Sequence, residues 1–553
     1  MRSPARQENS VEYDVIVVGS GSTGSVLAAR LSEDEHRTVL LIEAGEMYQQ
    51  LSQMPEDILD PSNMSTSMPG NKSSWSVPGT LIPGVSVPVP RGKGMGGSSA
   101  INGGYWERAP RSNFDDWVGL GNDEWSYDKV LPHYIRSEHD HDFEGELHGQ
   151  GGPIHVHRED PDRAPEFTAA FTEACTKMGF REDPDKNADG QGGVGPVPLN
   201  VWDGKRQNSG LTYLLPALSR PNLHVVGRAH ARRVLFDGTR CTGLEVDVAG
   251  DVRTYRGKEV VLSTGALRSP QLLMLSGIGP AAHLRAHGID VVQDLSGVGQ
   301  NLTDHPELSV KWEFDGKCTQ SPGRGVLTSA LNWTAENSSQ PDDLEILPFV
   351  ISSGDMMRVS TMAKNPKQAL SALRKTSTKF MVDQALNLRR PFTVVGLQQE
   401  DSRGTVELES ADPTKLPRIN WNLMAEESDR LRFREGIRTV SELYNSDAMR
   451  AIGAKMTNLD KNDLADGKSI DNWARSHIFA VGHPSCTCRM GSDPDDGAVV
   501  DQFGRVHGVQ GLRVADTSIF QRSPAEDPTQ PRSCSANDSW SSSHNPRRNE
   551  LRA

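Results

Sequence analysis

The chain of 553 residues has room for roughly two to four domains of ordinary size. It carries 73 acidic against 59 basic residues, and the formal net charge of −14 argues against a nucleic-acid partner, which would require a basic surface. No run approaches the roughly 18 apolar residues of a transmembrane segment, the start is too polar for a signal peptide, and six cysteines are too few for a disulfide scaffold. We therefore expect a cytoplasmic globular protein.

The start of the chain has the pattern of a dinucleotide-binding unit. Residues 13–18 form an apolar, β-branched run that predicts a buried parallel strand, and a helix is expected over 25–31. Between them lies a GxGxxG motif, which permits a tight turn and a close approach of the backbone to a pyrophosphate: Gly19, Ser20, Gly21, Ser22, Thr23 and Gly24. A second strand over 38–42 ends at Glu43, whose carboxylate can accept ribose hydroxyls and would repel the 2′-phosphate of NADP. The motif alone leaves FAD and NAD open.

Further segments with distinctive patterns are RGKGMGGSSAIN (91–102), STGALRSPQLLMLSGIGP (263–280), VGQNLTDHP (298–306), SRGTVELESADP (402–413), GHPSCTCRMG (482–491) and GVQGLRVADTSIF (508–520). Together with the opening strand, turn and helix, they resemble the glucose–methanol–choline (GMC) family of FAD-dependent oxidoreductases. They follow one another in the order of the family and extend the resemblance over residues 12–525.

The resemblance implies an α/β fold with two domains. A Rossmann-like FAD-binding domain is expected to be discontinuous, built from residues 12–155, 205–310 and 475–530. The rest, 156–204 and 311–474, is expected to form an α+β substrate-binding domain on an antiparallel sheet, with strands over 393–397 and 405–408. The polar, Met-rich segment 354–374 is expected to be a loop or a short helix at the substrate entrance.

The resemblance also predicts the residues that hold FAD. Besides the glycine motif and Glu43, these are Ala44, Trp75, Arg91, Gly96, Gly97, Ser98, Asn102, Ala231, Gly265 and Asp516. The loop that contains Gly97 is small and rich in donors, so its backbone can lie against an isoalloxazine ring, and the amide of Asn102 can bond a flavin carbonyl. Trp75 is open to two interpretations, an aromatic residue close to the flavin or a core tryptophan. Ile101 stands where some family members carry a histidine that tethers FAD, so we expect non-covalent binding.

His483 is the predicted catalytic base, because its segment resembles the one that holds the family's active-site histidine. Imidazole titrates near neutrality and can accept the hydroxyl proton of an alcohol. The second catalytic position of the family, a His or Asn, is occupied here by Asp527, whose carboxylate accepts a proton but opposes a developing alkoxide. Cys486 and Cys488 are interpreted as structural, and no metal site is expected.

Two polar segments depart from this pattern. The resemblance stops at Pro531, and residues 531–553 are Ser- and Arg-rich with almost no apolar stripe, which predicts disorder in either a disrupted or a genuinely divergent end. The His-rich run over 137–149 has the composition of a metal-ligand set without its strict spacing, so a solvated acidic loop is the expectation there.

The predicted function is the oxidation of a small-molecule alcohol to an aldehyde or ketone, with FAD as the hydride acceptor. The segment that follows Asn102 favours the choline-oxidising side of the family. The final electron acceptor is O₂, a quinone or another carrier, and no oligomeric state is predicted. Two alternatives stay open: a role in secondary metabolism on a hydroxylated natural product, and a flavin-binding protein whose catalysis is impaired by the altered C-terminus.

Overall fold

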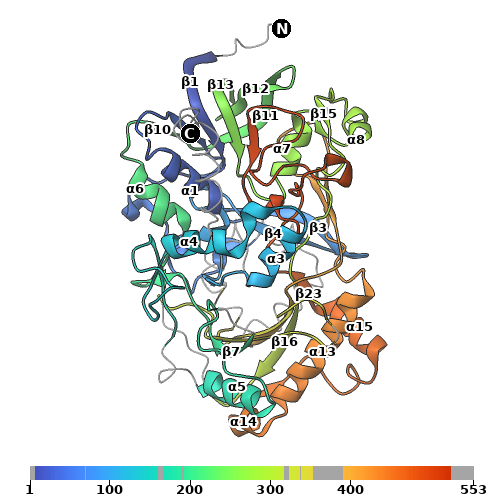
Figure 1. Cartoon of the computed structure of the whole chain (residues 1–553). Coiled ribbons are helices and arrows are strands. Elements are labelled where there is room, and N and C mark those ends of the chain that lie inside the picture. The colour runs from blue at the N-terminus through green and yellow to red at the C-terminus, as the bar shows by residue number, and fades with distance from the viewer. Residues whose placement is uncertain are drawn as a thin grey trace, which may run out of the picture.

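The computed structural model describes residues 7–68, 70–159, 166–188, 192–316, 323–336, 338–352, 356, 390–522 and 524. Two seven-stranded sheets lie toward opposite ends of the molecule, and a four-stranded sheet with several helices lies between them (Figure 1). Asp527 and the tail 531–553 fall outside the described residues, as does nearly all of 354–374.

The first large sheet has the order β10–β2–β1–β13–β12–β11, and β24 pairs with the last residues of β13. Its strands are β1 (Gln7–Val18), β2 (Val39–Ile42), β10 (Leu223–Val226), β11 (Ala229–Asp237), β12 (Arg240–Val248), β13 (Asp251–Leu262) and β24 (Leu512–Val514). The strands β10, β2, β1, β13 and β24 are parallel, whereas β11, β12 and β13 form an antiparallel meander.

The apolar run of β1 is continuous because both faces of the strand are buried. Val15 and Val17 pack on one face with helix α1 (Ser22–Leu31), while Ile16 and Val18 pack on the other face in a separate cluster. The predicted strand and helix are therefore present, and the helix begins three residues earlier than expected because Gly21 is its N-cap. This packing places the glycine turn at the carboxyl end of β1.

The second large sheet is antiparallel, as predicted, with the order β22–β16–β19–β18–β17–β7 and with β23 paired to β16. Its strands are β7 (Gly193–Pro196), β16 (Pro306–Glu313), β17 (Ser329–Trp333), β18 (Leu344–Phe349), β19 (Phe392–Leu397), β22 (Lys455–Met456) and β23 (Ile478–Ala480). Helix α13 (Glu427–Tyr444) covers β18 and β19 with Phe433, Ile437 and Val440, whose spacing puts them on one helix face. The helices α5 (Glu166–Lys177), α14 (Asp447–Ala451) and α15 (Gly467–His477) complete this end.

The four-stranded sheet between the two ends has the order β20–β21–β3–β4. Its strands are β3 (Ser74–Ile82), β4 (Val85–Gly92), β20 (Thr405–Glu407) and β21 (Arg418–Asn420). The other elements used below or labelled in Figure 1 are α2 (Glu56–Leu59), α3 (Arg111–Gly119), α4 (Tyr127–Ser137), α6 (Leu215–Ala217), α7 (Ser269–Leu275), α8 (Ala281–Ala286), β5 (Glu138–Asp140), β6 (Ile154–Val156), β8 (Val201–Trp202), β9 (Lys205–Arg206), β14 (Ile278–Gly279) and β15 (Gln293–Asp294).

The His-rich segment 137–149 is only in part the solvated acidic loop that its composition predicts, because most of residues 141–147 are exposed but both ends of the segment are buried. Glu138, Asp140 and His148 are buried, and they come close enough together to offer ligand atoms to a cation. However, Arg108 pairs with Glu138 and Arg158 pairs with Asp140, so the carboxylates are already neutralised. Burial lowers the pKa of His148, but hydrogen bonds to neighbouring carboxylates outweigh it and raise that pKa to about 10. The expectation was wrong for the two ends because the charges that compensate their carboxylates come from Arg108 and Arg158, which lie outside the segment.

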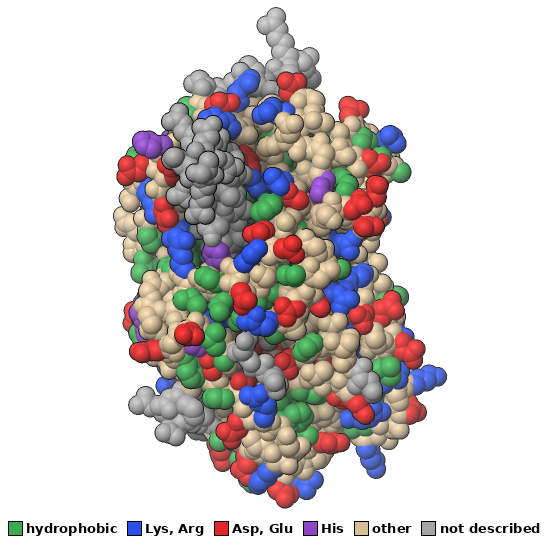
Figure 2. Space-filling view, viewed as in Figure 1, with side chains coloured by type: hydrophobic (Ala, Val, Ile, Leu, Met, Phe, Trp, Pro, Cys, Tyr) green, Lys and Arg blue, Asp and Glu red, His purple; other side chains and the backbone are tan. Residues whose placement is uncertain are grey.

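The surface has no segregated charge on the face shown in Figure 2, where acidic and basic side chains are intermixed. The net charge of −14 is thus spread rather than gathered on this face. Among the described residues, no helix is both long enough and apolar enough to span a membrane.

Candidate active site

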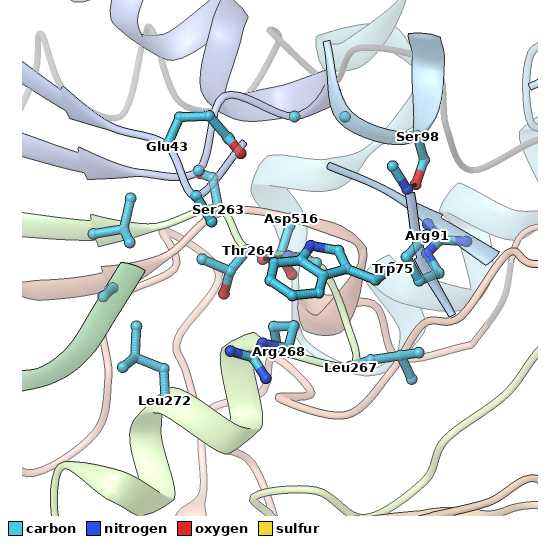
Figure 3. A pocket seen from close by; sticks show the side chains of 18 of the residues that line it. Glu43, Trp75, Arg91, Ser98, Ser263, Thr264, Leu267, Arg268, Leu272 and Asp516 are labelled. Carbon is cyan, nitrogen blue, oxygen red and sulfur yellow. Dashed lines mark hydrogen bonds between the residues drawn. The ribbon is translucent and has the colours of Figure 1, made fainter. Parts of the chain in front are cut away.

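A cavity lies where the carboxyl ends of β1, β2 and β13 meet (Figure 3). Many of the residues predicted to hold a dinucleotide line it: Gly19, Gly21, Ser22, Thr23, Glu43, Ala44, Trp75, Arg91, Gly97, Ser98, Ala231, Gly265 and Asp516. Residues from seven separate parts of the sequence therefore converge on one space. In Figure 3, Glu43 and Leu272 lie on one side of the view, Arg91 and Ser98 on the other, and Trp75 lies between them.

The glycine turn is shaped by backbone packing. Gly19 has a φ of +98°, and a Cβ atom there would lie 2.5 Å from the carbonyl oxygen of Ser263. A Cβ on Gly24 would lie 1.8 Å from the carbonyl oxygen of Gly19, so the first turn of α1 packs directly on the loop. The N-cap of α1 is Gly21, which has no side chain to cover the helix end. The positive end of the helix dipole therefore faces the cavity and suits an anionic group.

Glu43 braces this turn as well as lining the cavity. One carboxylate oxygen accepts hydrogen bonds from the backbone N–H and the hydroxyl of Ser20, both at 2.8 Å, and the other accepts from the N–H groups of Gly45 and Gly94 at 2.6 and 3.0 Å. Four protein donors thus converge on a buried carboxylate. Ser20 itself is buried behind the cavity wall.

Three other predicted residues are also not among those that line the cavity. Gly24 lies in the first turn of α1 and packs against the backbone of Gly19. Gly96, with a φ of +88°, donates its N–H to the carbonyl of Ser20 at 2.8 Å. The side-chain oxygen of Asn102 accepts a hydrogen bond from the N–H of Gly104 at 3.2 Å. Gly96 thereby joins the two glycine-rich loops, and none of the three residues is among those that line the cavity.

Asp516 connects the end of β24 to the second glycine turn. Its carboxylate accepts from the N–H of Gly265 at 2.9 Å and from the hydroxyl of Ser269, the first residue of α7, at 2.5 Å. Burial raises the pKa of this carboxyl, while the hydrogen bonds from Ser269 and Ser518 lower it. The side chain holds the wall of the cavity together.

Arg268 and His230 line the cavity but were not predicted from the sequence. The guanidinium of Arg268 lies 3.1 Å from Nε2 of His230 and 5.6 Å from the ring centroid of Trp75. Burial lowers the pKa of Arg268 to about 10. For Arg268 the only sequence signal was the position of this residue in the segment 263–280, because an isolated arginine at a helix start has no distinctive spacing.

His483 lies next to this cavity and is clamped through its backbone. Arg91, which lines the cavity, donates to the carbonyl of Gly482. One oxygen of Asp304 also accepts hydrogen bonds from the N–H groups of Gly482 and His483, at 3.2 and 2.8 Å. Burial and then the charge of Arg91 lower the pKa of His483 to about 3, so this imidazole is neutral at ordinary pH.

A second imidazole faces His483. Nδ1 of His305 lies 3.4 Å from Nδ1 of His483, and Nε2 of His305 lies 3.0 Å from the carbonyl oxygen of Pro524. The two rings meet because Thr303 pairs with Ser485 in an antiparallel bridge, just beyond the pairing of β16 with β23. Asp304 and His305 were not predicted as site residues, although the block 298–306 contains both.

Buried carboxylates follow on the second large sheet. Glu307 on β16 and Glu345 on β18 are both cross-strand neighbours of Gly396 on β19, so they share one face of the sheet. Burial raises the pKa of Glu345 to about 8 and that of Glu307 well above its usual range, and their mutual repulsion adds to the shift of Glu307. Glu400 is also fully buried, with its pKa raised for the same first reason.

Comparison with known proteins agrees on one family. Two family models described as GMC oxidoreductase match residues 13–307 and 400–533. An uncharacterized GMC-type oxidoreductase of Rhodococcus erythropolis is 37% identical over 93% of this chain and 95% of its own length. An oxygen-dependent choline dehydrogenase of Brucella ovis is 38% identical over 93% and 92%. Among solved structures, a formate oxidase of Aspergillus oryzae studied for modification of its FAD superposes with a TM-score of 0.83, at 26% identity over 97% of this chain and 99% of that one.

The cavity has the features that FAD requires. The adenine is suited by an apolar wall that includes Ala229 and Leu272, and the pyrophosphate by the exposed N-terminus of α1. A Cβ on Gly265 would meet no protein atom within 4 Å, so the wall there leaves space for a ligand. The chain therefore belongs to the GMC oxidoreductase family, and it is an oxidoreductase with FAD as its cofactor.

Proposed function

We propose that the protein oxidises an alcohol to an aldehyde or a ketone and that His483 is the catalytic base. The observation that carries this proposal is a neutral imidazole clamped by Arg91 and Asp304 beside the cavity that suits FAD. A base must be unprotonated before it can accept a proton, and the lowered pKa of His483 keeps it so.

In the proposed reaction the O–H bond of the alcohol breaks, and its proton bonds to a ring nitrogen of His483. The adjacent carbon gives up a hydride and becomes the carbonyl carbon. When bound, FAD supplies the acceptor for that hydride. Arg91, Gly97, Ser98 and the walls around Trp75 would hold the cofactor and exclude water from this end of the cavity.

The buried carboxylates favour a substrate that carries a positive charge. Glu307 follows two residues after His305, and it shares a sheet face with Glu345. A cationic group beside them would favour their ionised forms and offset the cost of their burial. We therefore propose an amino alcohol as the substrate class, which agrees with the choline named in the Brucella ovis relative.

Anaerobic mixing of the holoenzyme with alcohols tests both parts. We expect choline to bleach the flavin faster than its uncharged carbon isostere does, and His483→Ala to slow flavin reduction about 10²- to 10⁴-fold without loss of FAD. Full activity of His483→Ala would remove the proposed base. Bound FAD that no alcohol bleaches would favour the non-catalytic alternative and would implicate Asp527.

Three further points remain proposals. FAD is held without a covalent link, because Ile101 cannot form one, so acid precipitation should release the chromophore.

Reduced FAD is reoxidised by O₂, as the name of the Brucella ovis relative favours. Comparing the rate of oxygen consumption with the rate of quinone reduction tests this. The division into 12–155, 205–310 and 475–530 against 156–204 and 311–474 is supported by most strands of the two large sheets, but β23 and the start of β16 belong to the second sheet. Limited proteolysis tests this division.

A further inference from the structure

The chain of contacts from Pro524 to His483 restricts where the ring protons lie. The carbonyl oxygen of Pro524 can only accept a hydrogen bond, so Nε2 of His305, at 3.0 Å, is the donor. A neutral imidazole that carries its proton on Nε2 presents a lone pair on Nδ1. Nδ1 of His305 therefore acts as an acceptor toward Nδ1 of His483, 3.4 Å away.

The same reasoning then applies to His483. If its Nδ1 donates to His305, its own lone pair is on Nε2, because a neutral imidazole has one protonated nitrogen. We propose that His305 is a positioning residue that holds His483 in the Nδ1–H tautomer, so that Nε2 is the atom that takes the proton from the alcohol. This inference rests on the proposed role of His483 as the base.

The geometry also gives His305 a part after the proton has moved. The alcohol O–H bond breaks and an Nε2–H bond forms, which turns His483 into an imidazolium. The Nδ1 proton stays on His483 and donates to His305, so no proton passes between the rings. An accepting neighbour favours the charged form of His483. That help is needed because burial and the positive charge of Arg91 both disfavour it.

The surroundings restrict the alternatives. Three charged or titratable groups are known to contact His483 or act on it: Arg91, Asp304 and His305. Arg91 can only donate, and one oxygen of Asp304 is engaged with the backbone N–H groups of 482 and 483. Of these three groups, His305 is the one whose recorded contact is with the imidazole ring itself. It is also held in place, being only 2% exposed.

Two substitutions of His305 separate positioning from a merely structural role. His305→Asn keeps an acceptor oxygen near the place of Nδ1, whereas His305→Leu fills a similar volume with no acceptor. We expect the Leu variant to lower the limiting rate constant of anaerobic flavin reduction at least about 10²-fold, with FAD content and the apparent Kd of the alcohol little changed. The Asn variant should stay within about tenfold of wild type.

A control and a direct measurement complete the test. His507→Leu removes a different histidine, itself partly buried, whose Nε2 also contacts a backbone carbonyl, that of Gly491, and it should leave flavin reduction unchanged. In the ¹⁵N-histidine-labelled wild-type holoenzyme, the resonances that disappear in His483→Ala should show a protonated Nδ1 and an unprotonated Nε2. This spectrum stays informative even if the Leu variant fails to fold.

The outcomes are distinct. A protonated Nε2 on His483, a Leu variant within threefold of wild type, or an Asn variant no better than the Leu variant would each overturn the inference. If His483→Ala itself retains activity, the base assignment fails. If His483→Ala loses activity while His305→Leu keeps it, only the role of His305 fails.

Discussion

The two ends of the site are built by different means. The nucleotide end uses backbone: glycines at which a Cβ would collide with a carbonyl, a bare helix N-terminus, and a carboxylate that braces the turn. The reaction end uses titratable side chains that burial has shifted from their ordinary pKa values, above all His483 and Asp304. The contrast teaches that the glycine turn at the first end tolerates almost no added atom, while the second end should tolerate isosteric changes but respond to pH.

The strongest test of this contrast adds one carbon to the glycine turn. We expect Gly24→Ala to abolish FAD binding, because its Cβ would lie 1.8 Å from a backbone oxygen that cannot move without opening the turn. The matched control is Gly119→Ala at the end of α3, where a Cβ meets nothing within 4 Å. The ratio of flavin to protein absorbance after gel filtration measures both. Normal flavin content in Gly24→Ala would contradict this account.

A smaller but still large effect is expected from Glu43→Gln. Glu43 now accepts hydrogen bonds from four donors, and the amide NH₂ group of glutamine would face two of them. A buried donor left without an acceptor costs about 1–3 kcal/mol. FAD affinity should fall about ten- to hundredfold, measured by titration of the apoprotein. Glu46→Gln is the control, since Glu46 is exposed and pairs with the exposed Arg228, and such pairs contribute little. Equal behaviour of the two variants would argue against the bracing role of Glu43.

At the reaction end, Asp304→Asn should change how stability depends on pH. Burial raises the pKa of Asp304 from 3.8 to about 7, although N–H groups such as that of His483 lower it. Folding therefore favours the protonated form, and the resulting stability is present below about pH 4 and lost as the pH rises through 7. Asparagine does not titrate and keeps the accepting oxygen.

Thermal unfolding of both proteins at pH 5 and pH 8 checks this. The unfolding temperature of wild type should fall more between the two pH values than that of Asp304→Asn. Both should fall to some extent, because Glu307 and Glu345 also have raised pKa values. If the unfolding temperatures of the two proteins fell by the same amount between pH 5 and pH 8, Asp304 would be ionised in the folded protein throughout this range.

The smallest effect is expected from Ala231→Val on β11. This residue lines the cavity, and we expect its contact with the cofactor to run through the backbone, which the larger side chain leaves intact. FAD affinity should stay within about twofold. A tenfold loss would show that the side chain at 231 faces the adenine.

Local patterns in the sequence were enough to predict the nucleotide end. The continuous apolar run of β1, the glycine turn and Glu43 lie within one short stretch, so their spacing alone indicates a strand, a turn and a helix. The strand over 393–397 likewise matches β19, which begins one residue earlier. Here local propensity and tertiary packing agree.

The reaction end could not be predicted in the same way. His305 meets His483 because residues about 180 positions apart pair as antiparallel segments, and no periodicity in either segment reveals that register. The ionic cluster around His148 was missed for the same reason, since its arginines come from other segments. Burial also shifts the pKa values of the titratable groups at this end, and such shifts depend on the folded surroundings and not on residue type alone.

The pairing of β24 with β13 has a consequence for how the protein matures. Residues 512–514 complete the sheet whose other strands lie before residue 263, and Asp516 then fastens the glycine turn at 265. During synthesis, the ribosome must therefore add about 250 residues after β13 before the cofactor site can close. Capture of FAD is thus a late event in biogenesis, and a nascent chain released before residue 516 should be unable to retain it.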